Sequence, residues 1–194
     1  MKLRMTHGKA GGFTLIELLI VVAIIAILAA IAVPNFLEAQ TRSKVSRAKT
    51  DVRTIATGME AYFVDHNAYP PRPDGWIYPL RFIPLTTPVA YLTSIPEDPF
   101  KLTAGAFNTG GDGASTDASY DYFARSWTDN VDWLHLVFLG FEDRAKYLLA
   151  SIGPDLRWWG VNNVFGVVYN PTNGTRSEGE IVYVGPGFGF PGQE

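Results

Sequence analysis

Glu17 supplies the only ionisable side chain in the most apolar stretch of the chain. Phe13–Val33 is a run of 21 residues whose only strongly polar members are Thr14 and Glu17. A carboxylate in such surroundings is expensive, so Glu17 is expected to have a function and a partner. If the chain is cut between Gly12 and Phe13, the new α-amine of Phe13 is a cation near neutral pH and a suitable partner, on the same chain or on an adjacent copy. The alternative is a carboxylate that snorkels to the nearby interface and does nothing further.

Other reactive chemistry is scarce. The chain has no Cys, which excludes disulfides, thiolate-bound metals and thiol nucleophiles, and its three His are scattered. No Ser, His and acid set has a recognisable local signature, and no glycine-rich phosphate loop occurs. The formal net charge of −3 excludes a generally basic nucleic-acid binder. We therefore interpret the chain as a non-enzyme with no nucleic-acid partner.

The segment that carries Glu17 is long enough to cross a membrane. As a helix, residues 13–33 span about 31 Å, close to the thickness of the hydrocarbon layer. Residues 1–12 carry three basic and no acidic side chains, so this leader is expected to stay in the cytoplasm with one span following it. A secretory signal peptide cut near Ala30-Ile31-Ala32 is the competing interpretation, but such apolar cores are typically shorter.

The helical pattern continues beyond the apolar run. Residues 34–66 carry an apolar stripe with alternating spacings of three and four, which indicates an amphipathic continuation packed on the globular part. The stripe consists of Val45, Ala48, Val52, Ile55, Met59 and Tyr62. Pro34 removes one backbone hydrogen bond and should weaken the helix, and Pro70-Pro71 prevents its extension. We expect one helix from Phe13 to near His66.

Residues 67–194 are rich in Gly and Pro and carry eight basic against fourteen acidic side chains. A long loop is expected up to Phe100, and aromatic and β-branched runs then predict four strands. These are 120–125, 146–152, 165–169 and 180–184, with a turn signal at Pro171-Thr172-Asn173-Gly174 between the last two. The apolar segment 127–141 is ambiguous between helix and loop. The expected fold is α+β, a long N-terminal helix whose second half packs on a small antiparallel sheet.

The N-terminal residues resemble a known motif. Gly11-Gly12-Phe13-Thr14-Leu15-Ile16-Glu17, the apolar run and Pro34 are similar to the processing site and first helix of type IV pilins and of the related type II secretion pseudopilins. The resemblance implies that a prepilin peptidase cuts between Gly12 and Phe13 and N-methylates Phe13. It also implies that Glu17 pairs with the terminal amine of a neighbouring copy, and that the helix before Pro34 can unwind on assembly into a filament.

Short C-terminal elements resemble the major pseudopilin. They are Ile95-Pro96-Glu97-Asp98-Pro99-Phe100, Tyr120-Asp121-Tyr122 and Ser151-Ile152-Gly153-Pro154-Asp155, in that order. That family binds calcium in the loop after the last element. Here Leu156-Arg157-Trp158-Trp159 replaces the usual acidic, glycine-rich loop.

Calcium remains a prediction for this chain, with Asp155, Glu178 and Glu180 as its candidate ligands. It needs six to eight oxygens, so backbone carbonyls and water would supply several of them. Solvated loop charges are the simpler interpretation of these residues, as a plain turn is for Asp112 and Asp117.

The resulting hypothesis is a pilin-like filament subunit with a cleaved leader (1–12), a transmembrane and filament-core helix (13–33), an amphipathic continuation (34–66) and a periplasmic globular domain (67–194). We favour the pseudopilus of type II secretion. Its implied partners are the prepilin peptidase, minor pseudopilins, other copies and an assembly platform in the bacterial inner membrane. A type IV pilus subunit is the alternative within the class, and a membrane-anchored or secreted binding module using aromatics such as Trp158 and Trp159 lies outside it.

Overall fold

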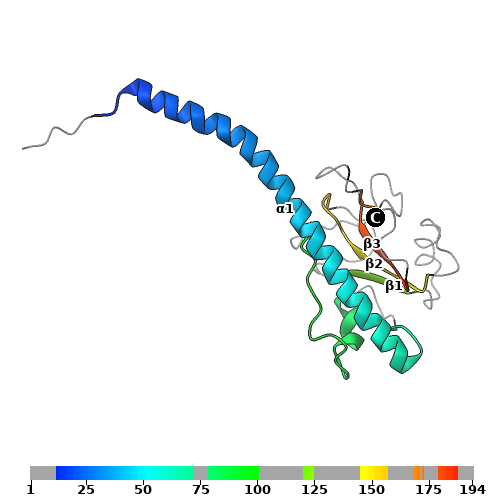
Figure 1. The fold of residues 1–194 in the computed structure, drawn as a ribbon. Coiled ribbons are helices and arrows are strands. Elements are labelled where there is room, and N and C mark those ends of the chain that lie inside the picture. Colours follow the sequence, from blue (N-terminus) through cyan, green and yellow to red (C-terminus); the bar gives the residue numbers. More distant parts are fainter. Residues whose placement is uncertain are drawn as a thin grey trace, which may run out of the picture. The chain divides into compact units, whose positions relative to one another are not determined.

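The computed structural model describes residues 12–71, 78–100, 120–124, 145–156, 168–170, 172 and 179–187. Its elements in chain order are one long helix, a 3-10 helix and three strands (Figure 1). The chain divides into two compact units, residues 1–39 and residues 40–194. The candidate pieces 127–141, Asp112, Asp117, Trp158 and Trp159 lie outside the described residues.

Helix α1 (Leu15–His66) confirms the expected single helix. It begins two residues after Phe13 and runs through Pro34 without a break in its helical backbone. At its end Asn67 takes a left-handed φ of 49° and its N–H donates to the Phe63 carbonyl at 2.8 Å. This is the usual way a helix stops with Asn in place of Gly. The helix therefore ends before Pro70-Pro71 can disturb it.

The apolar stripe of α1 faces the core of the second unit. Five of its six members are buried, and Tyr62 is partly buried against them. Gly58, a weak helix former in the middle of this face, is explained by a close neighbour. A Cβ at Gly58 would lie 2.8 Å from Cγ of Leu92, so the Leu92 side chain can approach the helix this closely because position 58 has no side chain.

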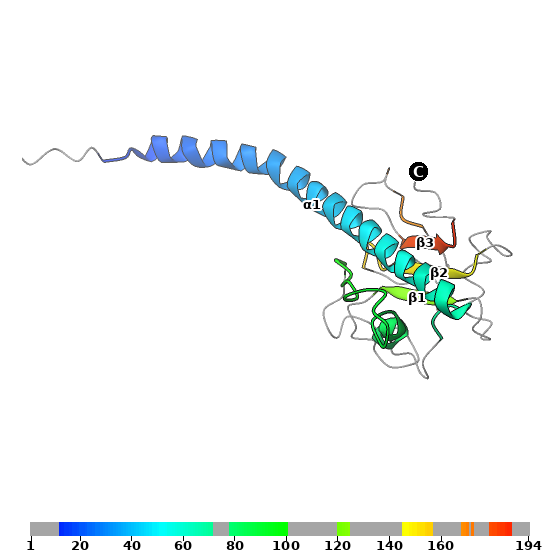
Figure 2. The same ribbon diagram turned by 60° about the horizontal axis from the view of Figure 1, so that its bottom comes forward.

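Within the described residues the sheet has three strands, β1 (Asp121–Ala124), β2 (Tyr147–Ser151) and β3 (Ile181–Gly185), in the order β1-β2-β3 and antiparallel throughout. Figures 1 and 2 show the second half of α1 lying across one face of it. All five residues of β2 are buried, so the sheet is covered on both faces. Three of the four predicted strands are thereby confirmed.

The fourth predicted strand, 165–169, differs. In its described part, Val168 forms a single bridge to Glu180, and the bridge is parallel. The Tyr169 N–H donates to the Glu180 carbonyl at 2.8 Å. Val168 and Tyr169 therefore lie beside the residue that precedes β3. The expected fourth strand was an antiparallel partner of β3, and these two residues do not form one.

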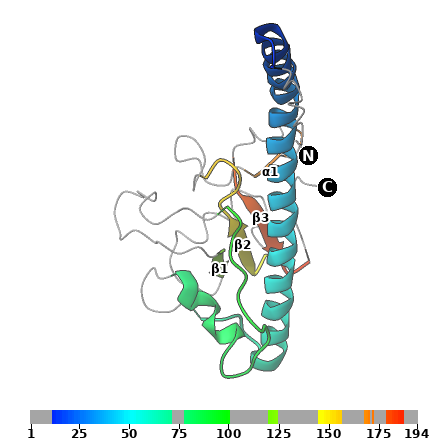
Figure 3. The ribbon, with the colours of Figure 1, turned by 90° about the vertical axis from the view of Figure 1, so that its left-hand side faces the viewer.

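The segment expected to be a loop contains the 3-10 helix η1 (Tyr78–Leu85), which lies next to β1 (Figure 3). Its two prolines favour a loop in the sequence, but a short 3-10 segment tolerates Pro better than an α-helix interior does. Fully buried Arg81 forms an ion pair with Asp121 at the start of β1 and donates to the Tyr122 carbonyl at 2.8 Å. A buried pair of this kind fixes how η1 docks on the sheet.

Candidate functional site

The first unit exposes its apolar surface. In the described part of the chain α1 is the one helix long and apolar enough to cross a membrane, with a mean hydropathy of 3.1 over its best window and none of that window buried. From Phe13 to Leu37, sixteen large apolar side chains are exposed. No described residue of the first unit covers them, and an apolar surface of this size is typical of a contact with lipid or with another protein.

The predicted cleavage bond lies outside α1. Gly12, Phe13 and Thr14 precede the helix, and the Phe13 side chain is 84% exposed. A Cβ built on Gly12 would meet no atom within 4 Å. Within the described residues, no contact therefore requires glycine at position 12.

Glu17 lies in the first turn of α1 and contacts Thr14. Its Oε2 accepts the Thr14 N–H at 2.9 Å and the Thr14 hydroxyl at 2.8 Å, while the Glu17 N–H points to the Thr14 Oγ1 at 3.3 Å. This is a capping box, with Thr14 at the N-cap and Glu17 at N3. The box explains why the helix begins at Leu15. The sequence signal of the box, a Thr followed three residues later by Glu, is local. The box makes Thr14 a partner of Glu17, besides the terminal amine that the sequence suggested.

In the second unit, Asp98 joins the pseudopilin-like C-terminal elements. Its side chain is 2% exposed; Oδ1 accepts the Phe100 N–H at 2.8 Å and Oδ2 accepts the Ile152 N–H at 3.2 Å. The Ser151 hydroxyl also donates to it, and desolvation raises the pKa of the Asp98 carboxyl above its usual value. One buried carboxylate thus binds the 95–100 segment to the end of β2. No local pattern in the sequence indicates that this acid is buried.

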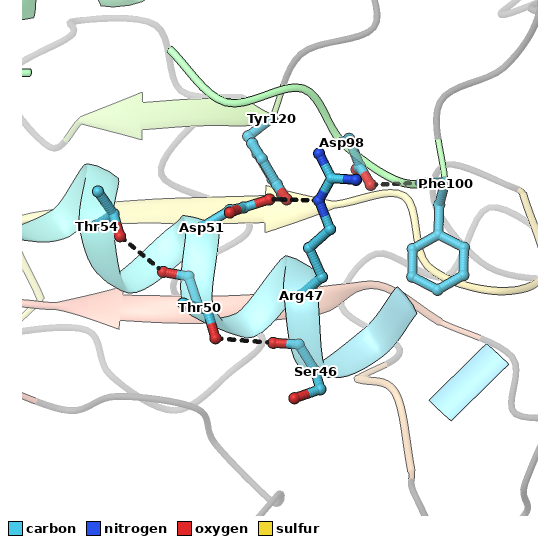
Figure 4. A network of polar contacts seen from close by, with 8 residues as sticks. All are labelled: Ser46, Arg47, Thr50, Asp51, Thr54, Asp98, Phe100 and Tyr120. Atoms are coloured by element: carbon cyan, nitrogen blue, oxygen red, sulfur yellow. Dashed lines mark hydrogen bonds and ion pairs between the residues drawn. The ribbon is translucent and has the colours of Figure 1, made fainter. Parts of the chain in front are cut away.

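A second polar group lies beside Asp98 (Figure 4). On α1, Asp51 accepts the Tyr120 hydroxyl at 2.9 Å, and its Oδ2 lies 3.6 Å from Nε of Arg47. Further along the same helix, Oε1 of Glu60 accepts the Tyr147 hydroxyl at 2.8 Å. These phenol–carboxylate hydrogen bonds attach α1 to the sheet. The carboxylates of Asp51 and Glu60 therefore have a structural role.

The calcium candidates are only partly described. Asp155 follows β2 and its Oδ2 accepts the Gly179 N–H at 3.1 Å, and Glu180, 5% exposed, precedes β3. Glu178 lies outside the described residues. Gly153 follows β2 with a φ of 80° and lies directly against the backbone of Gly179. A Cβ at Gly153 would lie 2.3 Å from the Gly179 carbonyl oxygen, so this contact requires glycine. Within the described part of the chain, no three Asp, Glu or His side chains gather closely enough to hold a metal ion.

A long helix with an uncovered apolar first half and an amphipathic second half on a small antiparallel sheet defines the pilin-like α+β class. Residues 8–33 match the model of the prokaryotic N-terminal methylation motif. The chain is 31% identical over 144 residues to the type II secretion system core protein G of Pseudomonas aeruginosa, which covers 63% of this chain and 99% of that protein. A protein of the same name from Pectobacterium carotovorum is 27% identical over 56% of this chain and 76% of that protein.

Pilins match over a smaller share of their length. The type IV major pilin protein PilA of Myxococcus xanthus is 49% identical over 69 residues, which are 36% of this chain and 31% of that pilin. No solved structure matches the chain significantly. The chain belongs to the family of the type II secretion system core protein G, within the pilin-like class.

Proposed function

We propose that this protein is a subunit of a periplasmic pseudopilus of type II protein secretion. The observation that carries the proposal is the alignment along almost the whole of a core protein G, at 31% identity over 99% of its length. The matched pilins share higher identity but less than half of their own length, for example 31% and 47% for two of them. The globular unit therefore favours the pseudopilin over the pilin.

Processing is the first step of the proposed function. A prepilin peptidase on the cytoplasmic side cuts between Gly12 and Phe13 and methylates the Phe13 amine. The match of residues 8–33 to a methylation motif supports this, as does the position of both residues ahead of α1. Peptidases bind extended backbone, which residues outside a helix supply more readily than residues within one. Among the described residues, no atom lies close to a Cβ built on Gly12, which agrees with a glycine required by an enzyme rather than by packing.

Assembly is the second step. Copies stored in the inner membrane with their N-termini in the cytoplasm polymerise through the first half of α1, together with minor pseudopilins and on a membrane assembly platform. Glu17 attracts the Phe13 amine of an adjacent copy, while Thr14 holds the carboxylate at the helix start. The stretch before Pro34 loosens when the copy enters the fibre, because the proline nitrogen cannot bond the Ala30 carbonyl.

Calcium binding by Asp155, Glu178 and Glu180 remains part of the proposal. Asp155 and Glu180 lie on the two segments that meet where Gly153 contacts Gly179. If calcium is bound there, it would neutralise the carboxylates and fix the segment between residues 156 and 179 on the end of the sheet. No catalytic residue is proposed.

A type IV pilus subunit is the second candidate, favoured by the 49% identity to a PilA pilin. Deleting the gene and measuring both exoprotein release and surface piliation separates the two, since loss of pili with normal release would select the pilus.

The mass of the mature N-terminus tests whether this protein is a processed filament subunit, of a pseudopilus or of a pilus. A methylated Phe13 supports the filament subunit, whereas a chain that begins at Val33 indicates ordinary secretion and a chain that keeps residues 1–12 excludes processing. Glu17→Ala is expected to insert into the membrane but to polymerise poorly. Normal fibres from that variant would show that the Glu17 pairing is not needed.

A further inference from the structure

An open groove of about 430 Å³ lies in the second unit, between α1 and the 97–99 segment. Ser43, Lys44 and Arg47 line it from the helix, and Glu97, Asp98 and Pro99 line it from the other side. The three helix residues are exposed and can all donate hydrogen bonds. None of them belongs to the apolar stripe that holds α1 on the sheet.

Lys44 and Arg47, the two cations of the groove, each contact another side chain of the second unit. The Lys44 ammonium lies 6.0 Å from the centroid of the buried Phe100 ring. Arg47 faces Asp51 with its Nε, and Asp51 is itself fixed by the Tyr120 hydroxyl. Figure 4 shows the two terminal nitrogens of the Arg47 guanidinium directed away from Asp51. The edge formed by those two nitrogens is the part of an arginine that binds a carboxylate or phosphate in a bidentate manner.

The opposite wall carries two carboxylates, of which one is exposed. Asp98 is 2% exposed, and both of its oxygens accept backbone N–H groups, so it forms the floor of the groove and presents no free oxygen to a ligand. Among the described residues of the lining, Glu97 is the one exposed carboxylate. The buried Asp98 keeps its charge, but the groups that a ligand can reach are two cations, a hydroxyl and Glu97, and the three donors among them suit an oxyanion.

We propose that this groove binds an acidic side chain of a second copy of this chain. The charge distribution favours that occupant. From residue 42 to residue 53 the helix carries five basic side chains and one acid, whereas residues 67–194 carry fourteen acidic and eight basic side chains. In a head-to-tail polymer, the basic helix segment of one copy and the acidic globular part of the next would attract each other. The inference rests on the proposed function, because polymerisation is what brings the second copy to the groove.

A photo-cross-linker tests the occupant in the assembled protein. The full chain carries p-benzoylphenylalanine at Ser43 and is co-expressed with an epitope-tagged copy in cells that assemble the filament. The expected product joins the two copies, and mass spectrometry places the cross-link on a peptide from residues 67–194 that contains Asp or Glu. The double variant K44Q/R47Q is expected to lower the yield about tenfold, the factor that 1.4 kcal/mol of binding supplies.

Arg53→Gln is the matched control, because Arg53 is exposed on the same helix but does not line the groove. It should leave the yield unchanged. The proposal is overturned by a cross-link to lipid or to a different protein, or by a yield that K44Q/R47Q does not change. If fibres form with a processed N-terminus and the groove cross-link is absent, this inference alone fails. An unprocessed N-terminus overturns the proposed function and this inference with it.

Discussion

Gly185, the last residue of β3, should not tolerate the smallest possible side chain. It pairs directly with Tyr147 across the β2–β3 ladder. A Cβ at Gly185 would lie 2.1 Å from Cζ of Tyr147 and 2.5 Å from each Cε. The ring cannot move away, since Tyr147 is fully buried, its hydroxyl is bonded to Glu60, and the Tyr69 ring lies 4.8 Å from it. Gly185→Ala must therefore displace either the strand or the ring.

The size of the effect follows from these contacts. Overpacking of a core costs about 1–3 kcal/mol. Pulling the Tyr147 hydroxyl off a carboxylate costs about 1.5–3 kcal/mol more. Replacing a strand glycine by alanine normally returns about 0.5–1 kcal/mol. The net expectation is a loss of about 1.5–5.5 kcal/mol. Each 1 kcal/mol lowers the Tm of a chain of this size by roughly 2–4 °C. The preference of a strand for alanine over glycine alone predicts a gain in stability for Gly185→Ala. A measured loss of stability would therefore already support the steric argument.

The assay is thermal unfolding of the full chain in detergent micelles, followed by near-UV circular dichroism of the aromatic side chains. Tyr147→Leu provides the matched background, because leucine lacks the Cε and Cζ atoms that the new methyl group would meet. Gly185→Ala should cost little in that background. An equal cost in the native and the Tyr147→Leu backgrounds would refute the steric argument, and Gly12→Ala, where a Cβ meets nothing, should leave the Tm unchanged.

Three further predictions concern the second unit. Asp98→Asn is expected to lower the free energy of unfolding by about 1–3 kcal/mol in chemical denaturation, because an amide nitrogen in place of Oδ2 cannot accept the Ile152 N–H; an unchanged midpoint would contradict the role given to this carboxylate. Burial, more than any other cause, raises the pKa of the phenols of Tyr120, Tyr122 and Tyr147, so the folded state keeps protons that the unfolded state loses. This contribution to the free energy of unfolding is complete below about pH 10, the usual pKa of a tyrosine, and it is lost as the pH rises above that value. A Tm that stays constant from about pH 9 to about pH 11.5 would contradict this prediction. If calcium is bound after β2, a chelator should lower the Tm and added calcium should restore it, whereas a chelator-insensitive Tm would argue against a structural ion.

The helix and most of the sheet could be predicted from the sequence because their signals are local and periodic. The stripe from Val45 to Tyr62 follows a helical repeat, and its burial against the sheet is the direct consequence. The strands β1, β2 and β3 are runs of aromatic and aliphatic residues bounded by turn formers. The capping box of Thr14 and Glu17 is also a local signal, although the expectation for that glutamate named only the terminal amine.

The rest depends on contacts between residues far apart in the chain, which no local pattern encodes. Arg81 and Asp121 are separated by 40 residues, and each alone has the pattern of a surface charge. Asp98 is buried because the end of β2 supplies its donors. The glycine at position 185 is typical of a turn, and its requirement becomes visible only when Tyr147 is placed opposite. Whether Asp155, Glu178 and Glu180 hold calcium stays a prediction for the same reason.

The exposed first half of α1 limits what can drive assembly. Fully burying a large apolar side chain is worth about 1.5–3 kcal/mol, and sixteen such side chains are exposed from Phe13 to Leu37. Their total exceeds the net stability of an ordinary domain of about 5–15 kcal/mol, so this half-helix does not remain in water. In the proposed function it moves from lipid to neighbouring helices, and lipid tails are as apolar as leucine. The hydrophobic effect therefore cancels between the two states. The preference for the polymer must then come from close packing and from polar contacts, and Glu17 is the one ionisable side chain between Phe13 and Val33 that can supply such a contact.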